Sequence, residues 1–197
     1  MGFLDALFGR RTPTKPDLDA LFALPSAALT LQVGSGFTPT GVGSVCYRAS
    51  EGAAFAGIEQ DVQRLLDADG GPAVERVADE YGFTWLVCRQ DPDDLPALVT
   101  DLHAVNRALE DAGFGPSLLC SLVVFSHADG RRLGLVYLYK QGTFYPFAPA
   151  AGPRRAVGGG QQRDNALELQ VRGTLAGDLR IEPELSRWLA VWGAPGL

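Results

Sequence analysis

The chain has 197 residues, 46% of them hydrophobic and 20% charged, and its formal net charge is −6 at pH 7. This length and composition predict one globular domain with a sizeable core, and the acidic balance argues against broad nucleic-acid binding. No eighteen-residue apolar run predicts a membrane-spanning helix, and we expect no signal peptide because no basic segment precedes the first apolar residues.

An amphipathic segment and a linker occupy residues 1–16, ahead of one α+β domain at 17–197. The candidate contact residues are the apolar Phe3, Leu4, Leu7 and Phe8 and the basic Arg10 and Arg11. Nine residues cannot hold a helix alone in water, so another surface must cover this apolar stripe. Two alternatives stay open. The stripe packs on the protein's own core, or it contacts a membrane surface or a partner groove, with the basic residues near lipid headgroups.

Short elements are predicted for the region that follows. Residues 18–22 repeat the five residues 4–8 and predict a similar short helix. Residues 29–33 alternate between apolar and polar and predict a strand, and 44–48 predict a returning strand. A Gly-rich turn and loop at 34–43 lie between these strands. The glycines do not form a phosphate-binding loop, because the Gly-Lys-Ser/Thr sequence of such a loop is missing.

The stretch 83–147 organises the rest of the chain. Before it, the spacing of residues 51–67 predicts an amphipathic helix, and 74–79 predict an edge strand. The stretch itself opens with an apolar run at 83–89, which predicts a second strand. One short further strand is expected toward its end, in the segment 140–147.

A well-punctuated helix is predicted from the acidic turn at 91–94 to residue 112. Pro96 must lie in the first turn because it lacks an N–H, which places the N-cap at Asp93 or Asp94. Gly113 supplies the left-handed position after the helix. The acidic turn could instead be a metal or acid–base site, but capping and the helix dipole account for it.

Two apolar runs, 118–125 and 133–139, predict a β-hairpin. Asp129-Gly130 between them is typical of a type I′ turn, in which both central residues have positive φ. Both runs are nearly continuous rather than alternating, which predicts a sheet covered on both faces. One cover must be helix from this chain, and the other is either more helix or a second copy of the protein.

The C-terminal region is predicted to be looser. Residues 149–163 are rich in Gly, Pro and Arg and predict a flexible loop, and 165–176 predict a helix. A final helix is expected from Pro183 to Gly193. Its apolar face consists of Leu185, Trp188, Leu189 and Trp192, and we expect these side chains to seal a core.

Residue chemistry alone names no catalytic site. Cys46, Cys88 and Cys120 lie inside apolar runs without a CxxC spacing, which predicts buried free thiols in a reducing cytoplasm. We expect no cofactor and no metal, since neither a zinc-ligand spacing nor an acid or nucleophile partner for either His is evident. A candidate surface site consists of Lys140, Tyr145 and Arg163.

Several stretches carry a resemblance to a known family. They are MGFLDALFGR, PDLDALFALPSAALTLQ, GFTPTGVGSVCYR, DPDDLPALVTDLHAVN, LVYLYKQGTFYPFAP, RDNALELQVR and LSRWLAVWGAPGL. With them the chain resembles the actinobacterial phage-shock-protein-A-associated family PspAB over nearly its whole length. The resemblance implies a role in the cell-envelope stress response beside a PspA-type protein and a membrane metalloprotease, and it transfers no catalytic residue. The helix–hairpin pattern is also similar to the YbjN and type III secretion chaperone fold, which binds partner proteins and often dimerises.

Three functional hypotheses follow. The first is a non-enzymatic cytoplasmic adaptor or chaperone-like protein, peripheral to the inner face of the membrane, with an α+β fold of a mainly antiparallel sheet and packed helices. The second is an enzyme with a polar site near Lys140, Tyr145 and the 154–164 loop, and the third is a homodimeric structural module. An apolar groove would favour the adaptor, whereas a deep polar pocket with converging titratable groups would favour the enzyme.

Overall fold

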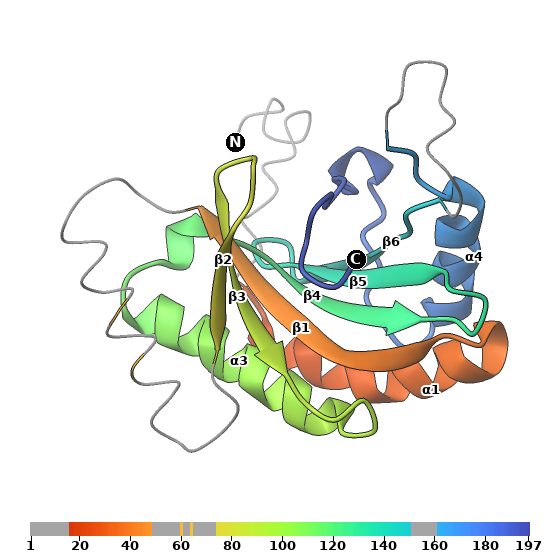
Figure 1. The fold of residues 1–197 in the computed structure, drawn as a ribbon, viewed down its shortest axis with the longest axis horizontal. Helices are drawn as coiled ribbons and strands as arrows, with labels where there is room; N and C mark the ends of the chain where they lie inside the picture. Colours follow the sequence, from red (N-terminus) through yellow and green to blue (C-terminus); the bar gives the residue numbers. More distant parts are fainter. Residues whose placement is uncertain (1–15, 49–59, 61–63, 65–73, 151–160) are drawn as a thin grey trace, which may run out of the picture.

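The fold is an antiparallel sheet with helices packed on it, as the computed structural model in Figure 1 shows. It describes residues 16–48, 60, 64, 74–150 and 161–197. The sheet has six strands in the order β2-β3-β1-β4-β5-β6. The strands are β1 (Thr38–Arg48), β2 (Glu75–Ala78), β3 (Phe83–Arg89), β4 (Leu118–Ser126), β5 (Arg132–Leu138) and β6 (Thr143–Phe147). The helices are α1 (Leu24–Ser35), α3 (Leu95–Asp111) and α4 (Asn165–Leu175), with 3₁₀ turns η1 (Leu18–Ala23), η2 (Gly115–Ser117) and η3 (Leu185–Arg187). The predicted α+β class is therefore confirmed.

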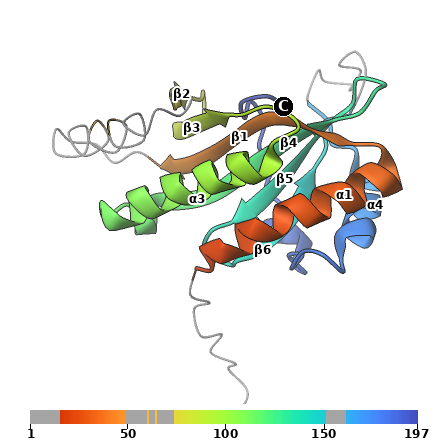
Figure 2. The same ribbon diagram turned by 90° about the horizontal axis from the view of Figure 1, so that it is seen from below.

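The helices α1 and α3 cover one face of the sheet, which Figure 2 shows from below. The predicted punctuation of α3 is confirmed: the Asp94 carboxylate accepts a hydrogen bond from the Ala97 N–H at 3.1 Å, and Gly113 follows the helix with φ of 88°. The buried residues of α3 have helical spacing and include Leu98, Leu102 and Val105. α4 packs beside α1 and β6 and confirms the helix predicted at 165–176.

The β4–β5 hairpin is confirmed in register but differs in its turn. Phe125 pairs with Leu133, and the loop closes with His127 N–H donating to the Arg131 carbonyl at 3.0 Å. Gly130 has φ of 90°, whereas no described non-Gly residue has positive φ, so Asp129 does not adopt the type I′ conformation. The loop is the longer form in which a type I turn precedes one left-handed glycine.

The strand predicted at 29–33 is wrong, because these residues belong to α1. Pro25 lies in the first turn of α1, and Gly36, with φ of 71°, ends it by donating its N–H to the Gln32 carbonyl. The buried residues are Leu24, Ala27, Ala28 and Leu31, whose spacing is that of a helix. The apparent alternation of 29–33 arose from Leu29 and Val33 on the exposed side of the helix.

The loop predicted at 39–43 is also wrong, because β1 runs through it. The register between β1 and β4 shifts between Pro39 and Gly43, which is a β-bulge. Gly41 has φ of 72°, and a Cβ there would lie 2.1 Å from the Gln90 carbonyl oxygen. Only glycine fits this close approach. The glycines of this region therefore belong to a bulged strand and not to a loop.

Within the described part of the chain, one helical stretch, Leu18–Ser35, is long and apolar enough to cross a membrane by length and composition. A search for uninterrupted apolar runs of eighteen residues misses this stretch, because polar residues interrupt it. Leu21, Leu24 and Leu31 within it are fully buried against the sheet. Such burial is typical of a core helix, which passes the same test.

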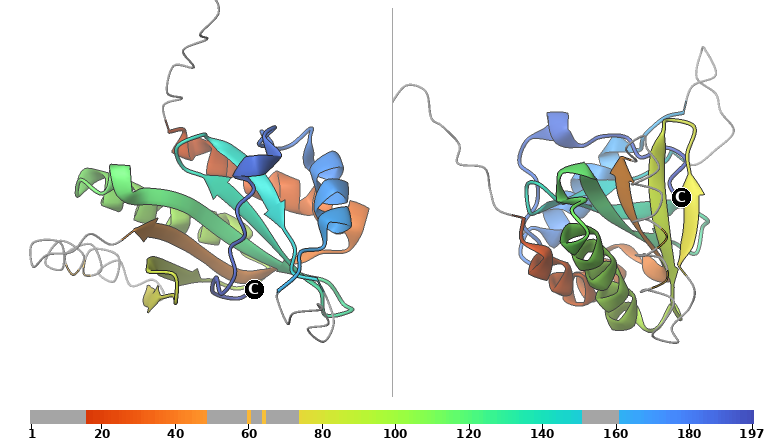
Figure 3. Two further views of the ribbon diagram at one scale, coloured as in Figure 1. Left: turned by 90° about the horizontal axis from the view of Figure 1, so that it is seen from above. Right: turned by 90° about the vertical axis from the view of Figure 1, so that its left-hand side faces the viewer.

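The final helix predicted at 183–193 is wrong. Only η3 is helical there, and the remaining residues run irregularly across the sheet face opposite α1 and α3, as Figure 3 shows. The two tryptophans pack individually: Trp188 stacks on Tyr145 with ring centroids 5.9 Å apart, and Trp192 meets Phe147 edge-on at 4.8 Å. The second cover of the sheet is therefore the chain's own C-terminal segment (residues 183–197).

The strands expected at 74–79 and within 140–147 are confirmed as β2 and β6, and residues 18–22 form η1, a 3₁₀ turn.

Other predictions lie wholly or partly outside the described residues. The candidate contact residues at 1–11 lie outside the described residues. So does the helix predicted at 51–67, apart from Gln60 and Arg64, which are helical, and so does most of the loop at 149–163.

Candidate binding groove

A cavity of about 540 Å³ lies between the sheet and the C-terminal segment. We call it the open-face groove. Its floor is one row of residues paired across four strands: Trp85 of β3, Cys46 of β1, Cys120 of β4 and Leu138 of β5. Leu189, Val191 and Trp192 form the wall on the side of the C-terminal segment. The volume is in the range of small-ligand and peptide side-chain pockets, and the lining is mainly apolar.

The polar groups inside the groove bond to one another. The Trp85 Nε1–H donates to Asp79 Oδ2, and Asp79 Oδ1 accepts from the N–H groups of Tyr81 and Phe83, all at 2.9 Å. The Tyr145 hydroxyl donates to the Leu189 carbonyl at 2.9 Å, and burial raises the pKa of Tyr145. These groups hold the walls together, and their hydrogen bonds leave the interior suited to apolar side chains.

Two cations stand at one end of the groove. Arg48 ends β1 opposite Phe83, and Tyr47 pairs with Leu118, so Arg48 lies at the end of the sheet where β4 begins. Lys140 follows β5 at the same end, two strand spacings or about 10 Å away. The Arg48 guanidinium also lies 5.6 Å from the Phe83 ring centroid. The charged residues that line the groove are Arg48, Lys140, Arg187 and Asp79, so the lining carries a net positive charge in a chain whose net charge is negative.

Buried carboxylates hold the C-terminal segment in place. Glu182 accepts from the Thr143 hydroxyl at 2.7 Å and from the Glu184 N–H at 3.0 Å. Glu168 accepts from the Ala148 N–H and from Arg163 Nε, both at 2.9 Å. Arg163 also donates to the Trp188 carbonyl. The wall of the groove is thereby tied to β6 and α4.

The predicted surface site is only partly assembled. Lys140 and Tyr145 both line the open-face groove, whereas Arg163 lies behind its wall, with its guanidinium 5.0 Å from the Phe147 ring centroid. The sequence reasoning missed the pairing of Cys46 with Cys120. Trp192 was expected to seal a core and packs on Phe147, but it does so from an irregular segment and not from a helix. No local pattern joins β1 to β4, because their partners are far apart in the chain.

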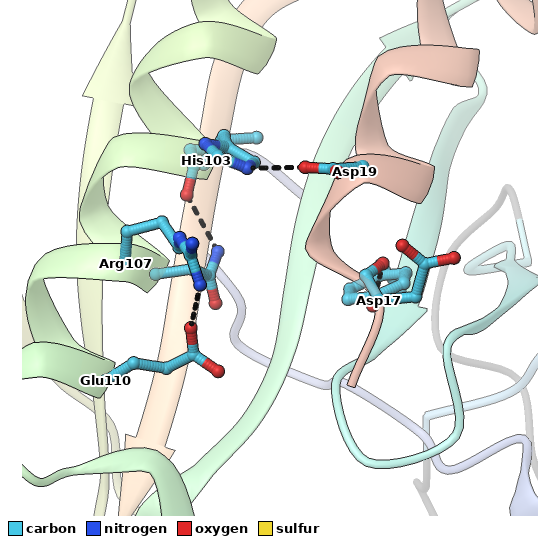
Figure 4. A network of polar contacts seen from close by, with 8 residues as sticks. Asp17, Asp19, His103, Arg107 and Glu110 are labelled. Atoms are coloured by element: carbon cyan, nitrogen blue, oxygen red, sulfur yellow. Dashed lines mark hydrogen bonds and ion pairs between the residues drawn. The ribbon is translucent and has the colours of Figure 1, made fainter. Parts of the chain in front are cut away.

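A second polar cluster lies on the helical side and is drawn in Figure 4. His103 of α3 pairs with Asp19 of η1 at 3.2 Å, and Arg107 pairs with Glu110 at 3.1 Å. The Glu110 carboxylate also accepts a hydrogen bond from the Tyr139 hydroxyl. These contacts connect η1, α3 and the end of β5. Among the described residues no group of three or more His, Cys, Asp or Glu is placed to hold a metal ion.

Comparison with known families decides the relationship. The model of PspA associated protein B matches residues 1–196. The chain belongs to the PspAB family. The description of that family associates it with PspA, as the sequence resemblance implied. Neither a curated protein nor a solved structure matches the chain, so the YbjN-like likeness stays a prediction.

Proposed function

We propose that this protein is a non-enzymatic adaptor of the envelope stress response that binds a PspA-type protein through the open-face groove. The observation that carries the proposal is the apolar groove itself, with its net positive lining, in a member of a PspA-associated family. The groove accepts apolar side chains of a partner, and Arg48 and Lys140 attract acidic residues beside them. The adaptor acts in the cytoplasm, at the inner face of the membrane.

The composition of the groove supports an adaptor over an enzyme. Asp79, Trp85 and Tyr145 make hydrogen bonds within the protein, and the high pKa of Tyr145 keeps its proton in place near neutral pH. A catalytic pocket would instead gather titratable groups that point toward a reacting atom. The lining is closer to that of a protein–protein interface, which buries the few partner side chains that carry most of the binding energy.

Asp17 lies at the end of the sheet that carries Lys140, on the helical face. The Asp17 carbonyl accepts a hydrogen bond from the Tyr137 hydroxyl at 2.6 Å. Tyr137 belongs to the core under α1 and α3, and the Cβ of Asp17 lies close to Gly142, in the same turn as Lys140. The apolar stripe around Leu4 and Leu7 is the second contact that we propose, to the partner or to the membrane.

The groove is tested with two leucines of nearly equal exposure. Leu189 on the groove wall is 64% exposed and Leu29 on the outside of α1 is 66% exposed. We expect Leu189→Asp to weaken binding to the purified PspA-type protein of the same organism at least about tenfold, since the groove would then hold a charge. Leu29→Asp is the matched control and should bind like the wild type, as measured by isothermal calorimetry.

Equal binding by both variants would overturn the groove as the contact. If Leu189→Asp instead dissociated a dimer in sedimentation experiments, the groove would be a self-interface and the homodimer hypothesis would replace the adaptor. Deletion of residues 1–11 tests the N-terminal contact separately. The truncated protein should keep its melting temperature and lose affinity for anionic liposomes or for the partner. Unfolding on truncation would show that the segment is part of the core.

A further inference from the structure

Cys46 and Cys120 face each other on the floor of the open-face groove. They are direct partners in the antiparallel pairing of β1 with β4. Direct partners project to the same side of a sheet, with Cα atoms about 4.5 or 5.5 Å apart, depending on the type of pair. A disulfide requires Cα atoms about 4.4–6.8 Å apart. The register shifts between Cys46 and Tyr47, next to this pair, but Cys46 and Cys120 stand opposite each other, so the strand spacing at the pair lies in the range that a disulfide requires.

The two thiols can be reached from the groove, and the third cannot. Cys46 and Cys120 both line the cavity, although only 3% and 7% of their surfaces are exposed. Cys88 of β3 is 1% exposed and belongs to the core on the helical side, under α3. The molecule thus carries a cysteine pair beside an open cavity and an internal control on the opposite face of the sheet.

We propose that Cys46 and Cys120 form a reversible disulfide across the groove floor, with a small-molecule disulfide as the oxidant. The Cys120 thiolate attacks one sulfur of the oxidant RSSR, forms a mixed disulfide and releases RS⁻. Cys46 then gives up its proton, attacks the Cys120 sulfur and releases the second RS⁻. Two S–H bonds break and one S–S bond forms, and the two electrons and two protons leave with two molecules of RSH.

The order of the two steps follows from the hydrogen bonding of the pair. A hydrogen bond with Cys120, together with burial, raises the pKa of Cys46. Cys46 therefore keeps its proton, and Cys120 is the more exposed of the two thiols, at 7% against 3%. Cys120 is the attacking thiol, and Cys46 is the resolving thiol.

The disulfide would change the shape of the groove. Bonded sulfurs lie about 2.05 Å apart, much closer than two thiols in hydrogen-bond contact. Trp85 and Leu138 stand on either side of the pair in the same floor row, so the two sulfurs draw together in the middle of the floor beneath the occupant. The effect on partner binding rests on the proposed function, whereas the disulfide itself does not.

The test uses the full-length protein and oxidised glutathione. After incubation, the protein is unfolded in urea so that all free thiols react with iodoacetamide, and intact mass and peptide mapping locate the products. We expect the loss of two of the three alkylatable thiols, a Cys46–Cys120 linked peptide, and full recovery with dithiothreitol. The Cys88→Ser control should form the same link. Cys46→Ser should stop at a glutathione adduct on Cys120, whereas Cys120→Ser should take up little glutathione.

Three alkylatable thiols after this treatment, or a link that includes Cys88, would overturn the proposal. So would equal glutathione uptake by Cys46→Ser and Cys120→Ser, since the assigned roles would then be wrong. Circular dichroism of each variant checks that the fold is retained. Because the readout is mass, it is independent of any partner. A protein that forms the disulfide yet does not bind the PspA-type protein would overturn the proposed function alone.

Discussion

The two faces of the sheet are covered by different kinds of chain, and the open-face groove lies on one of them. On the helical face, α1 and α3 present apolar side chains at regular helical spacing, and Leu31, Leu98 and Leu102 are fully buried. On the open face, the irregular C-terminal segment contributes single rings such as Trp188 and Trp192. Helical stripes fill a sheet surface continuously, whereas isolated rings leave gaps between them.

We expect the helical face to set the stability of the fold and the open face to carry the binding function. A continuous core gains free energy along its whole length, and any cavity in it is costly. The C-terminal segment is instead fixed at a few points, among them Glu182 and the Arg163–Trp188 hydrogen bond. This arrangement tolerates a hollow surface next to the segment. We expect binding changes to map to the open face and large stability changes to map to the helical face.

The largest expected effect is the loss of a core side chain on the helical face. Leu102 is fully buried, and a Cβ placed on Gly43 of β1 would lie 2.9 Å from its Cδ1, so the leucine fills the space between α3 and the sheet. Leu102→Ala should lower the free energy of unfolding by about 2–5 kcal/mol, because it leaves a cavity. Urea unfolding followed by circular dichroism measures the change.

The matched variant on the open face is Leu189→Ala. Its side chain is largely exposed, so the change should stay within about 0.5 kcal/mol. A similar loss from both variants would mean that the C-terminal segment is as much a part of the core as α3 is, and the contrast between the faces would fail.

Backbone hydrogen exchange sharpens the comparison inside the sheet itself. β4 and β5 are central strands with buried side chains, whereas β2 is a four-residue edge strand with mostly exposed ones. Amides in Leu122–Val124 should be among the slowest, and amides in Glu75–Ala78 should exchange at least about 100-fold faster, a difference of about 2.7 kcal/mol. Rapid exchange through both central strands would contradict their place at the centre of the fold.

Local signals in the sequence explain which elements could be predicted. α3 carries its own cap at Asp94 and its own stop at Gly113, and the β4–β5 hairpin carries Asp129-Gly130 between two apolar runs. Each of these signals lies within a few residues of the structure that it determines. For α1, the same apolar residues fitted a strand and a helix, and burial of Leu24 and Leu31 by the sheet decided between them.

The groove depends on contacts that no local pattern contains. Cys46 and Cys120 meet only because β1 inserts between β3 and β4, and that strand order is a property of the whole sheet. Lys140 and Tyr145, which were predicted to share a surface site, both line the groove. Arg163 was placed with them for its charge, yet its partners are Glu168 and the Trp188 carbonyl. The C-terminal helix was mispredicted because apolar spacing cannot distinguish a helix face from rings that pack one by one.

A smaller effect is expected where the C-terminal segment is tied down. Arg163→Met keeps the packing on Phe147 but removes the hydrogen bonds to Glu168 and to the Trp188 carbonyl. Arg163 is partly exposed but Glu168 is only 3% exposed and would keep the Ala148 N–H as a donor, so we expect a loss of about 1.5–3 kcal/mol in the free energy of unfolding. Tryptophan fluorescence should report a looser Trp188 as well. A variant that destabilised the protein without changing the fluorescence would place the effect of Arg163 in α4 rather than in the groove wall.

The smallest expected effect concerns Asp129, at the hairpin tip beyond both faces. The Arg131 backbone N–H donates to its carboxylate at 3.0 Å, and His127 and the Arg131 side chain also contact it. These bonds, the backbone one first, lower the pKa of Asp129 from 3.8 to about 2.

Because the pKa is lower in the folded state, the carboxylate stabilises the fold above about pH 4, and this contribution is lost as the pH falls toward 2. Asp129→Asn should therefore flatten the dependence of the urea midpoint on pH between 5 and 2.5, while Leu102→Ala should leave its slope unchanged. An NMR titration of the carboxyl carbon gives the pKa directly. Arg131→Gln keeps the backbone donor, so the pKa of Asp129 should remain below 3.8 in that variant. A return to 3.8 would assign the shift to the guanidinium and not to the backbone of the turn.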